Sequence, residues 1–471
     1  MPFVTGPLPQ RLKLVHGFGA VAFGVKDSGF SFFLLPFYNL VLGVDASTVG
    51  AALAAALVID ALVDPLIGHL SDRTYTKWGR RLPWLYLAPW PLALVWTMLW
   101  SPPFTGTPGF WDIVALAVGV RLLLSACEVP SVSLVPEITD DYDNRTTLFR
   151  YRFLSGWLGG LLMMVLTFTV FLPTPQSQLQ PEGYASYGLF GAALIALSVI
   201  GSAAAQHRIV AQLPERRPPP FSITGAFAEI FDAFREKAFV IFALGGLAAY
   251  VLQGMTFSIT QYVNLYVWQF SELAFQLYPA VLFLSVVLMF VIVGPLHRRW
   301  GKPKSAALGA LVGLAFYCSP YVFYLAGAWP TVGTTASTAL LYGFLVCANT
   351  ASVVAIISAT SMVAEIVEAF EERTGQRAEG TFYAGNWLVQ KCATGGGILL
   401  TSLIVQSIDL APGTPQTEVA PETVRQLVWL FMLAATVLAS IAAFWLARFP
   451  ISREQHEARV VARRGRPAPP A

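Results

Sequence analysis

Eight ionisable side chains lie within stretches of sequence that are otherwise long and apolar. They are four acids and four bases, namely Lys26, Asp27, Asp60, Asp64, Arg121, Glu128, Arg152 and Lys391. A charged group near the centre of a lipid bilayer is costly unless it is paired or hydrated. A set without net charge therefore predicts a paired network that faces a hydrated cavity and can bind a polar solute or an ion. Structural ion pairing alone is the alternative.

Asp60 and Asp64 carry the most specific spacing in this set. They are four residues apart, which places both carboxylates on one face of a helix, where two like charges repel each other. Something must neutralise the pair. The candidates are Lys391 or Arg152, a bound proton, or Na⁺, which as a hard cation favours several oxygen ligands. We interpret Asp60 and Asp64 as a site for Na⁺ or H⁺.

The elements that position these residues are membrane-spanning helices. Of the 471 residues 55% are hydrophobic and 12% are charged, whereas soluble domains carry about a quarter charged residues. Apolar stretches of about 20 residues, enough to cross a bilayer, recur along the whole chain, which excludes a single anchor or a signal peptide. Twelve spans are predicted, at 14–42, 47–70, 83–101, 110–136, 149–172, 184–207, 239–268, 273–296, 304–328, 333–367, 380–407 and 423–449.

The distribution of Lys and Arg predicts the orientation of these spans. Nearly all the basic residues of the loops lie on one side of the membrane, and the loops of the opposite side contain only Arg425. Since cytoplasmic loops are the positive ones, both termini are expected in the cytoplasm. The basic tail has the same explanation, so we expect the lipid bilayer as a partner and no nucleic acid.

A long polar break divides the spans into two groups of six. The two groups share a weak repeat, since Gly68 begins the polar end of span two and Gly294 begins a similar end of span eight. We predict an N-terminal six-helix bundle, a cytoplasmic linker, a C-terminal six-helix bundle and a basic cytoplasmic tail, at 1–207, 208–238, 239–449 and 450–471.

Signatures of an enzyme are missing from the sequence. It contains neither an HExxH motif nor a P-loop, and no span pairs a nucleophile with a histidine base. The four cysteines lie within predicted spans without CxxC spacing, which indicates packing. We therefore expect no enzymatic activity and no cofactor other than a coupling cation.

The organisation resembles the major facilitator superfamily, whose two six-helix halves rock about a central site. Asp72, Arg73, Gly79, Arg80 and Arg81 are similar to that superfamily's signature in the loop between helices two and three. The resemblance implies that Asp72 pairs with Arg80 or Arg81 and that breaking these contacts opens the cytoplasmic side. The alternative is that these arginines only set the topology.

A closer resemblance is carried by the segment from Asp60 to Gly68, Asp-Ala-Leu-Val-Asp-Pro-Leu-Ile-Gly. It is similar to the span-two motif of the glycoside–pentoside–hexuronide:cation symporters, the family of the bacterial melibiose carrier. The resemblance implies that Asp60 and Asp64 hold the coupling Na⁺, Li⁺ or H⁺. Lys391 matches a helix-eleven lysine placed near the cation site.

The same resemblance implies a set of solute-binding residues. Lys26 and Asp27 match a Lys-Asp pair of the first helix, Glu128 takes the acidic position of the fourth, and Arg152 matches a helix-five arginine. In the family such groups bond to sugar hydroxyls, which both donate and accept hydrogen bonds. A tryptophan that packs against the sugar in the melibiose carrier is Val132 here, so a galactoside is not specifically expected.

These observations predict a secondary active transporter that couples Na⁺ or H⁺ to the uptake of a sugar, a glycoside or a related polar solute. Two alternatives stay open: a lysolipid:Na⁺ symporter of the same fold, favoured by the loss of the stacking tryptophan, and a non-transporting membrane receptor or scaffold. The retention of Asp60, Asp64 and Lys391 speaks against the last. From the resemblance we expect a monomer in a bacterial inner membrane.

Overall fold

A computed structural model describes residues 6–139, 141–211, 231–374, 378–408 and 410–450 of the protein. These residues form helices joined by short connections, and the described ranges hold one isolated β-bridge, between Thr76 and Gly79. In lipid a backbone has no water to bond, so helices, which satisfy their own backbone groups, suit a bilayer. Of the predicted linker and tail, residues 212–230 and 451–471 lie outside the described residues.

Helices occupy the first six predicted spans. They are α1 (Gln10–Phe18) and α2 (Val21–Ser28) with the turns η1 (Gly29–Phe33), α3 (Leu34–Pro36) and η2 (Phe37–Val41), then α4 (Ala46–Arg73), α5 (Leu82–Leu87), α6 (Pro89–Trp100), α7 (Phe110–Ile138), α8 (Tyr142–Leu166) with η3 (Thr167–Phe171), and α9 (Pro181–Val210). The start of α8 has a side-chain cap. Asp141 accepts a hydrogen bond of 2.7 Å from the Asn144 backbone at the start of α8, as an N-cap does.

The short helix η4 (Ser177–Leu179) precedes α9. The elements of the later spans are η5 (Ala233–Arg235), α11 (Lys237–Tyr262), η6 (Val263–Val267), α12 (Glu272–Leu325), α13 (Thr335–Thr374), α14 (Glu379–Ser407), η7 (Gln416–Glu418) and α15 (Pro421–Ala447). Among the described residues ten helical segments are long and apolar enough to cross a membrane. α12 contains two predicted spans and turns at Gly301, whose φ of 73° favours glycine, while α5 and α6 share another. The prediction of an all-α membrane fold is confirmed.

Two compact units make up the chain, and they cut across the order of the sequence. One comprises Met1–Ile223, Gly254–Pro279 and Gly395–Val424, and the other comprises Thr224–Gln253, Ala280–Thr394 and Arg425–Ala471. The helices α11, α12, α14 and α15 therefore each contribute to both units. The predicted division into bundles at 1–207 and 239–449 stays a prediction.

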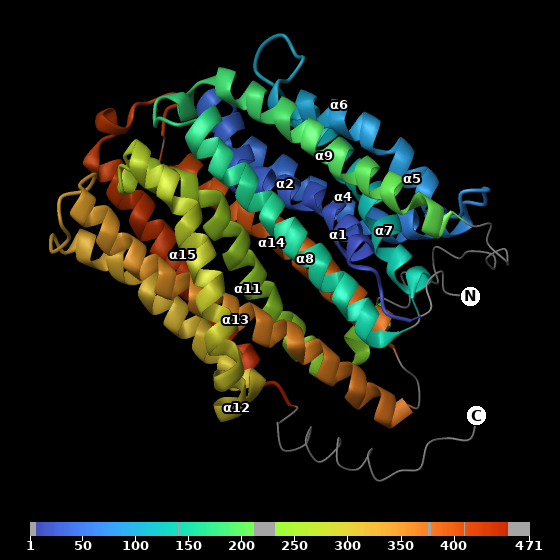
Figure 1. Ribbon diagram of the computed structural model, residues 1–471. Coiled ribbons are helices and arrows are strands. Elements are labelled where there is room, and N and C mark those ends of the chain that lie inside the picture. Colours follow the sequence, from blue (N-terminus) through green and yellow to red (C-terminus); the bar gives the residue numbers. More distant parts are fainter. Residues whose placement is uncertain (1–5, 140, 212–230, 375–377, 409, 451–471) are drawn as a thin grey trace. The chain divides into compact units, whose positions relative to one another are not determined.

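The first unit is held together by close helix contacts and an aromatic core. A Cβ atom added to Gly24 of α2 would lie 1.8 Å from the carbonyl oxygen of Gly156 in α8, so these two helices touch through their backbones. α6 runs beside α9 (Figure 1), and Trp100 stacks on Tyr184 with ring centroids 6.0 Å apart. α4 packs along α7, which is the contact that builds the charged cluster described below.

The second unit has its own apolar core. Phe239, Phe242, Met362, Phe382 and Leu446 are all buried in it, and they come from α11, α13, α14 and α15. An aromatic pair lies in this core, with the ring centroids of Phe239 and Phe382 5.5 Å apart and their planes tilted. Their burial explains why segments far apart in sequence form one unit.

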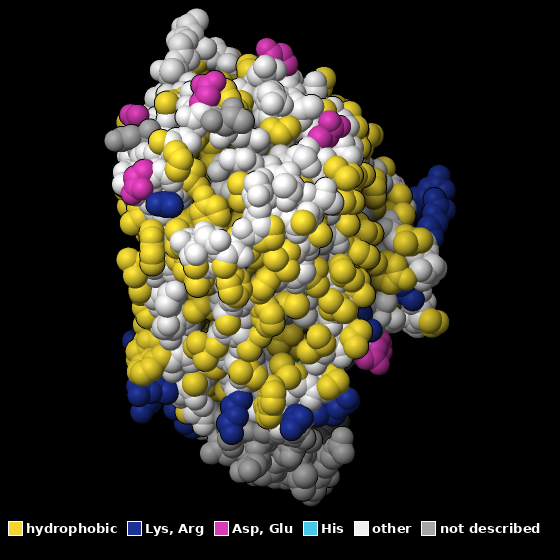
Figure 2. Space-filling model, turned by 90° about the vertical axis from the view of Figure 1, so that its left-hand side faces the viewer, with side chains coloured by type: hydrophobic (Ala, Val, Ile, Leu, Met, Phe, Trp, Pro, Cys, Tyr) yellow, Lys and Arg dark blue, Asp and Glu magenta, His cyan; other side chains and the backbone are white. Residues whose placement is uncertain are grey.

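The outward-facing side chains are those of a protein immersed in lipid. Large apolar residues such as Trp90, Leu197, Phe290 and Val291 are each at least 65% exposed. Figure 2 shows one face on which hydrophobic side chains cover the middle and Lys and Arg gather towards one end. An exposed apolar surface of this kind is expected of a protein that crosses a bilayer several times and not of a soluble one.

Candidate functional site

The carboxylates of Asp60 and Asp64 meet at Ser125, a residue of α7. Both aspartates project from α4, and the Ser125 Oγ lies 3.1 Å from Oδ1 of Asp60 and 2.7 Å from Oδ1 of Asp64. A hydroxyl has a single hydrogen, so Ser125 can donate to one of these oxygens at a time. A proton on a carboxyl group or a cation among the oxygens would make both short contacts favourable. The geometry thus suits a pair of acids that binds a cation.

Arg121 supplies the positive charge at Asp60. It precedes Ser125 by one turn of α7, and its Nη1 donates to Oδ2 of Asp60 at 3.1 Å. Both side chains are buried, with 7% and 5% of their surface exposed. The guanidinium also lies over the ring of Phe30, 4.5 Å from its centroid, which adds a cation–π contact.

The two basic residues predicted to neutralise the aspartates belong to α8 and α14. Arg152 of α8 donates from Nη1 to the Ser131 Oγ at 2.6 Å and so serves a different part of α7. Lys391 belongs to α14 and to the second compact unit. Its predicted place beside the aspartates stays a prediction.

The residues predicted to bind the solute come from three helices of the first unit. Lys26 and Asp27 of α2 form an ion pair with each other, and Asp27 keeps 67% of its side chain exposed. Arg152 lies over the ring of Phe23 in α2, 5.5 Å from its centroid. It also interacts electrostatically with Glu128 in α7. The three helices α2, α7 and α8 thus carry both an exposed acid, Asp27, and a buried base, Arg152.

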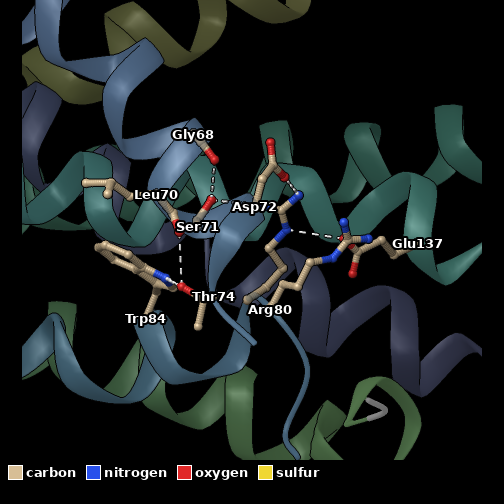
Figure 3. A network of polar contacts seen from close by, with 9 residues as sticks. Gly68, Leu70, Ser71, Asp72, Thr74, Arg80, Trp84 and Glu137 are labelled. Atoms are coloured by element: carbon tan, nitrogen blue, oxygen red, sulfur yellow. Dashed lines mark hydrogen bonds and ion pairs between the residues drawn. The ribbon is translucent and has the colours of Figure 1, made fainter. Parts of the chain in front are cut away.

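Three of the predicted gating residues, Asp72, Arg80 and Arg81, take part in a network at the end of α4 (Figure 3). Arg81 pairs with Asp72 and donates to the Ser71 Oγ at 2.6 Å. Its Nε also lies 3.2 Å from Glu137 Oε1 at the end of α7, and Arg80 reaches the same carboxylate at 3.3 Å. Of the two pairings expected of Asp72, the structure contains the one with Arg81.

Gly79 shapes the short loop that presents these arginines. Its φ is 89°, and its backbone N–H donates to the Thr76 carbonyl at 2.9 Å, which closes a tight turn. Trp84 fixes the other side, because its Nε1 donates to the Thr74 Oγ1 at 2.8 Å. Arg73, the remaining predicted gating residue, ends α4.

A third group of contacts joins early and late parts of the sequence inside the first unit. The hydroxyl of Tyr262 donates to Oδ1 of Asn39 at 2.9 Å, and the amides of Gln261 and Gln178 are hydrogen-bonded to each other. Near them α4 touches α14 so closely that a Cβ atom on Gly50 would lie 1.9 Å from the Ser402 Oγ. These neutral polar contacts connect the N-terminal spans with residues 254–279 and 395–424.

Comparison with known proteins places this chain in a family. Residues 15–453 match the family described as MFS/sugar transport protein. The chain therefore belongs to this family of the major facilitator superfamily, and it is a multi-pass membrane transporter and not an enzyme. The predicted family resemblance is confirmed.

Individual relatives agree over nearly the full length. An uncharacterised symporter of Synechocystis sp. is 27% identical over 94% of this chain and 94% of its own. A putative sulfoquinovose importer of Salmonella typhimurium is 26% identical over 92% of this chain and 90% of its own. Among solved structures, an inward-facing bacterial homologue of the lysosomal transporter Spinster has a TM-score of 0.66 at 14% identity, over 99% of this chain and all of its own, which shows the shared fold.

Sequence reasoning missed four partners in these clusters. Arg121 appeared only in the inventory of charged residues, and Ser125, Ser131 and Glu137 were not singled out. A signal was present, because Arg121, Ser125 and Glu128 recur at intervals of four and three and so share one face of α7. That face packs against the aspartates of α4. The sequence of either helix alone does not show this packing.

Proposed function

We propose that the protein is a cation-coupled symporter of a small polar solute, driven by Na⁺, Li⁺ or H⁺. The observation that carries this proposal is the meeting of Asp60 and Asp64 at one hydroxyl of Ser125, 3.1 and 2.7 Å away. Two carboxylates this close to one hydroxyl, one of them buried, favour a bound proton or cation because like charges side by side repel each other. The names of the relatives, which include symporters, support the same reading.

A sugar or glycoside is the solute class that this proposal favours. Lys26, Asp27, Glu128 and Arg152 offer both donors and acceptors from three helices, and a polyol presents hydroxyl groups of both kinds. Relatives are named for sulfoquinovose and for glycosides, which are compatible with that class. The exposed carboxylate of Asp27 is the group that we assign to the solute's outermost hydroxyls.

Alternating access would move the solute past these groups. The contacts of Tyr262 with Asn39 and of Gln261 with Gln178 are neutral and can be exchanged for water at little cost, as a closure that opens in every cycle requires. We assign the opposite closure to the Asp72–Arg81–Glu137 network, which includes Arg73, Gly79 and Arg80. Lys391 is assigned to the cation site in one state of the cycle.

The proposal includes an orientation and a location. Because basic residues dominate the loops at one side, both termini are placed in the cytoplasm. A relative is named as an inner membrane symporter, which supports a bacterial inner membrane for this chain. We expect the working unit to be a monomer.

A ligand screen by thermal unfolding tests the solute class. The detergent-purified protein would be heated with a panel of sugars, glycosides and lysolipids, each in Na⁺ buffer and in choline buffer at low pH. A solute at a hundred times its dissociation constant stabilises the folded state by about 2.7 kcal/mol, which a melting curve detects. We expect a sugar-like solute to raise the midpoint of the wild type and not that of Glu128→Gln.

Glu182→Gln is the matched control, because Glu182 is exposed at the start of α9, outside the charged clusters. It should respond as the wild type does. Stabilisation by lysolipids alone would contradict the sugar assignment, and equal stabilisation of Glu128→Gln would remove Glu128 from the solute site.

A further inference from the structure

Arg121 lies against Asp60, one of the two aspartates proposed above to bind the coupling cation. Its Nη1 donates to Oδ2 of Asp60 at 3.1 Å, so this carboxylate already has a full positive charge beside it. The other carboxylate oxygen, Oδ1, faces Ser125 at 3.1 Å. One of the two acids is thus compensated by the chain itself.

The arginine is built into this position. It is 6% exposed, lies over the ring of Phe30, and projects from the middle of α7. Within the described residues its buried Nε has no hydrogen-bond partner, so burial of the guanidinium leaves one of its donors unsatisfied. Removing a charge pair from water is expensive, and in some proteins a buried pair serves a specific role instead of adding stability.

A second cation at Asp60 would meet two obstacles. A hard cation such as Na⁺ or Li⁺ needs several oxygen ligands, whereas the groups at Oδ2 are N–H donors that cannot coordinate a metal. The guanidinium would also repel an ion bound to the same carboxylate, since like charges a few ångströms apart in a dry interior disfavour each other strongly. Without Arg121, the oxygens of Asp60, Ser125 and Asp64 would no longer face this fixed positive charge.

We propose that Arg121 is a tethered counter-cation that excludes Na⁺ and Li⁺ from the Asp60–Asp64 site and so determines which ion this transporter uses. The inference rests on the proposed cation coupling and specifies it. Of the coupling ions named above, it leaves the proton, which needs no set of oxygen ligands. Arg121 is a selectivity residue in this account, and the sequence pattern of the aspartates alone does not reveal it.

Ion-specific thermal stabilisation of the full chain tests this proposal. Purified wild type, Arg121→Lys and Arg121→Gln would be unfolded in NaCl, LiCl and choline chloride at one ionic strength and pH. Wild type and Arg121→Lys, which keeps the charge, should show equal midpoints in the three salts. Arg121→Gln keeps a donor for Asp60 but loses the charge, and should gain a Na⁺- or Li⁺-specific rise of about 3 °C or more. Adding Asp64→Asn to it should abolish that gain.

Two results would overturn the inference. One is a Na⁺-specific rise in the wild type that Asp60→Asn removes, a measurement that needs no Arg121 variant to fold. The other is an Arg121→Gln protein with wild-type helix content and elution volume that gains no response to either ion. Failure of the underlying coupling has a different signature: a solute from the screen would enter vesicles equally fast with and without any cation gradient. Arg235→Gln, which changes an 85% exposed arginine, is the control for loss of a positive charge.

Discussion

The helices α4 and α7 are connected by two charged clusters at different depths. The inner cluster joins Asp60 and Asp64 to Arg121, and the ion pair in it is at most 7% exposed on either side. The outer cluster joins Asp72 and Glu137 to Arg80 and Arg81, and its side chains range from 7% to 46% exposed. The same two helices thus carry one cluster built on a buried ion pair and one partly hydrated cluster.

The balance of charge differs as well. The outer cluster has two acids and two bases in mutual contact and needs nothing further to be neutral. The inner cluster brings two acids, Asp60 and Asp64, to one hydroxyl of Ser125, and Arg121 bonds to the first of them. A balanced cluster suits a structural brace or a gate, and two acids at one hydroxyl suit a site that loads and unloads a cation.

Replacing Asp60 by Asn should have the largest effect on stability. It leaves the Arg121 guanidinium buried without its carboxylate, and breaking a buried pair in this way costs about 3–5 kcal/mol. Thermal unfolding in detergent would show the loss. In the double variant Asp60→Asn, Arg121→Gln much of it should return, because no uncompensated charge is left. A double variant as unstable as the single one would contradict the assigned pair.

Replacing Arg81 by Ala should have the next largest effect. Its guanidinium connects Asp72, Ser71 and Glu137, and losing charged hydrogen bonds of this kind costs about 1.5–3 kcal/mol. If the network also closes the cytoplasmic side, a cysteine introduced nearby should react faster with a water-soluble thiol reagent in Arg81→Ala than in the parent. Unchanged reactivity together with lower stability would make the network a brace alone.

Replacing Arg80 by Ala should change stability least. Arg80 is 31% exposed and has one ion pair, of 3.3 Å to Glu137, so a loss of about 0–1 kcal/mol is expected. Comparison with Arg81→Ala in the same melting assay sharpens the distinction within the outer cluster. Equal losses of stability for Arg80→Ala and Arg81→Ala would show that burial of the arginine does not determine how much each one stabilises the fold.

Salt should separate the two clusters further. Between low and 0.5 M choline chloride, exposed charges are screened and buried ones much less. The destabilisation caused by Asp72→Asn should therefore shrink with salt, while that caused by Asp60→Asn should stay constant. A matching salt dependence for both variants would contradict the difference in hydration.

The sequence predicted the inner cluster only in part. The spacing of Asp60 and Asp64 on one helix face was sufficient to identify the pair, because both residues belong to one regular helix. Its partner Arg121 depends on how α7 is rotated against α4, which no local pattern encodes. The helix spans were predictable from apolar length, and the kink at Gly301 separates α12 into the two spans that were predicted there.

Gradient-driven uptake tests the central claim, the cation site of Asp60 and Asp64, most directly. Wild type and Asp64→Asn would be reconstituted in vesicles, and entry of a solute from the screen would be followed with and without an inward cation gradient. The account predicts that the gradient accelerates uptake by the wild type, whereas Asp64→Asn exchanges the solute across the membrane without responding to the gradient. Gradient-driven uptake by Asp64→Asn at the wild-type rate would contradict it.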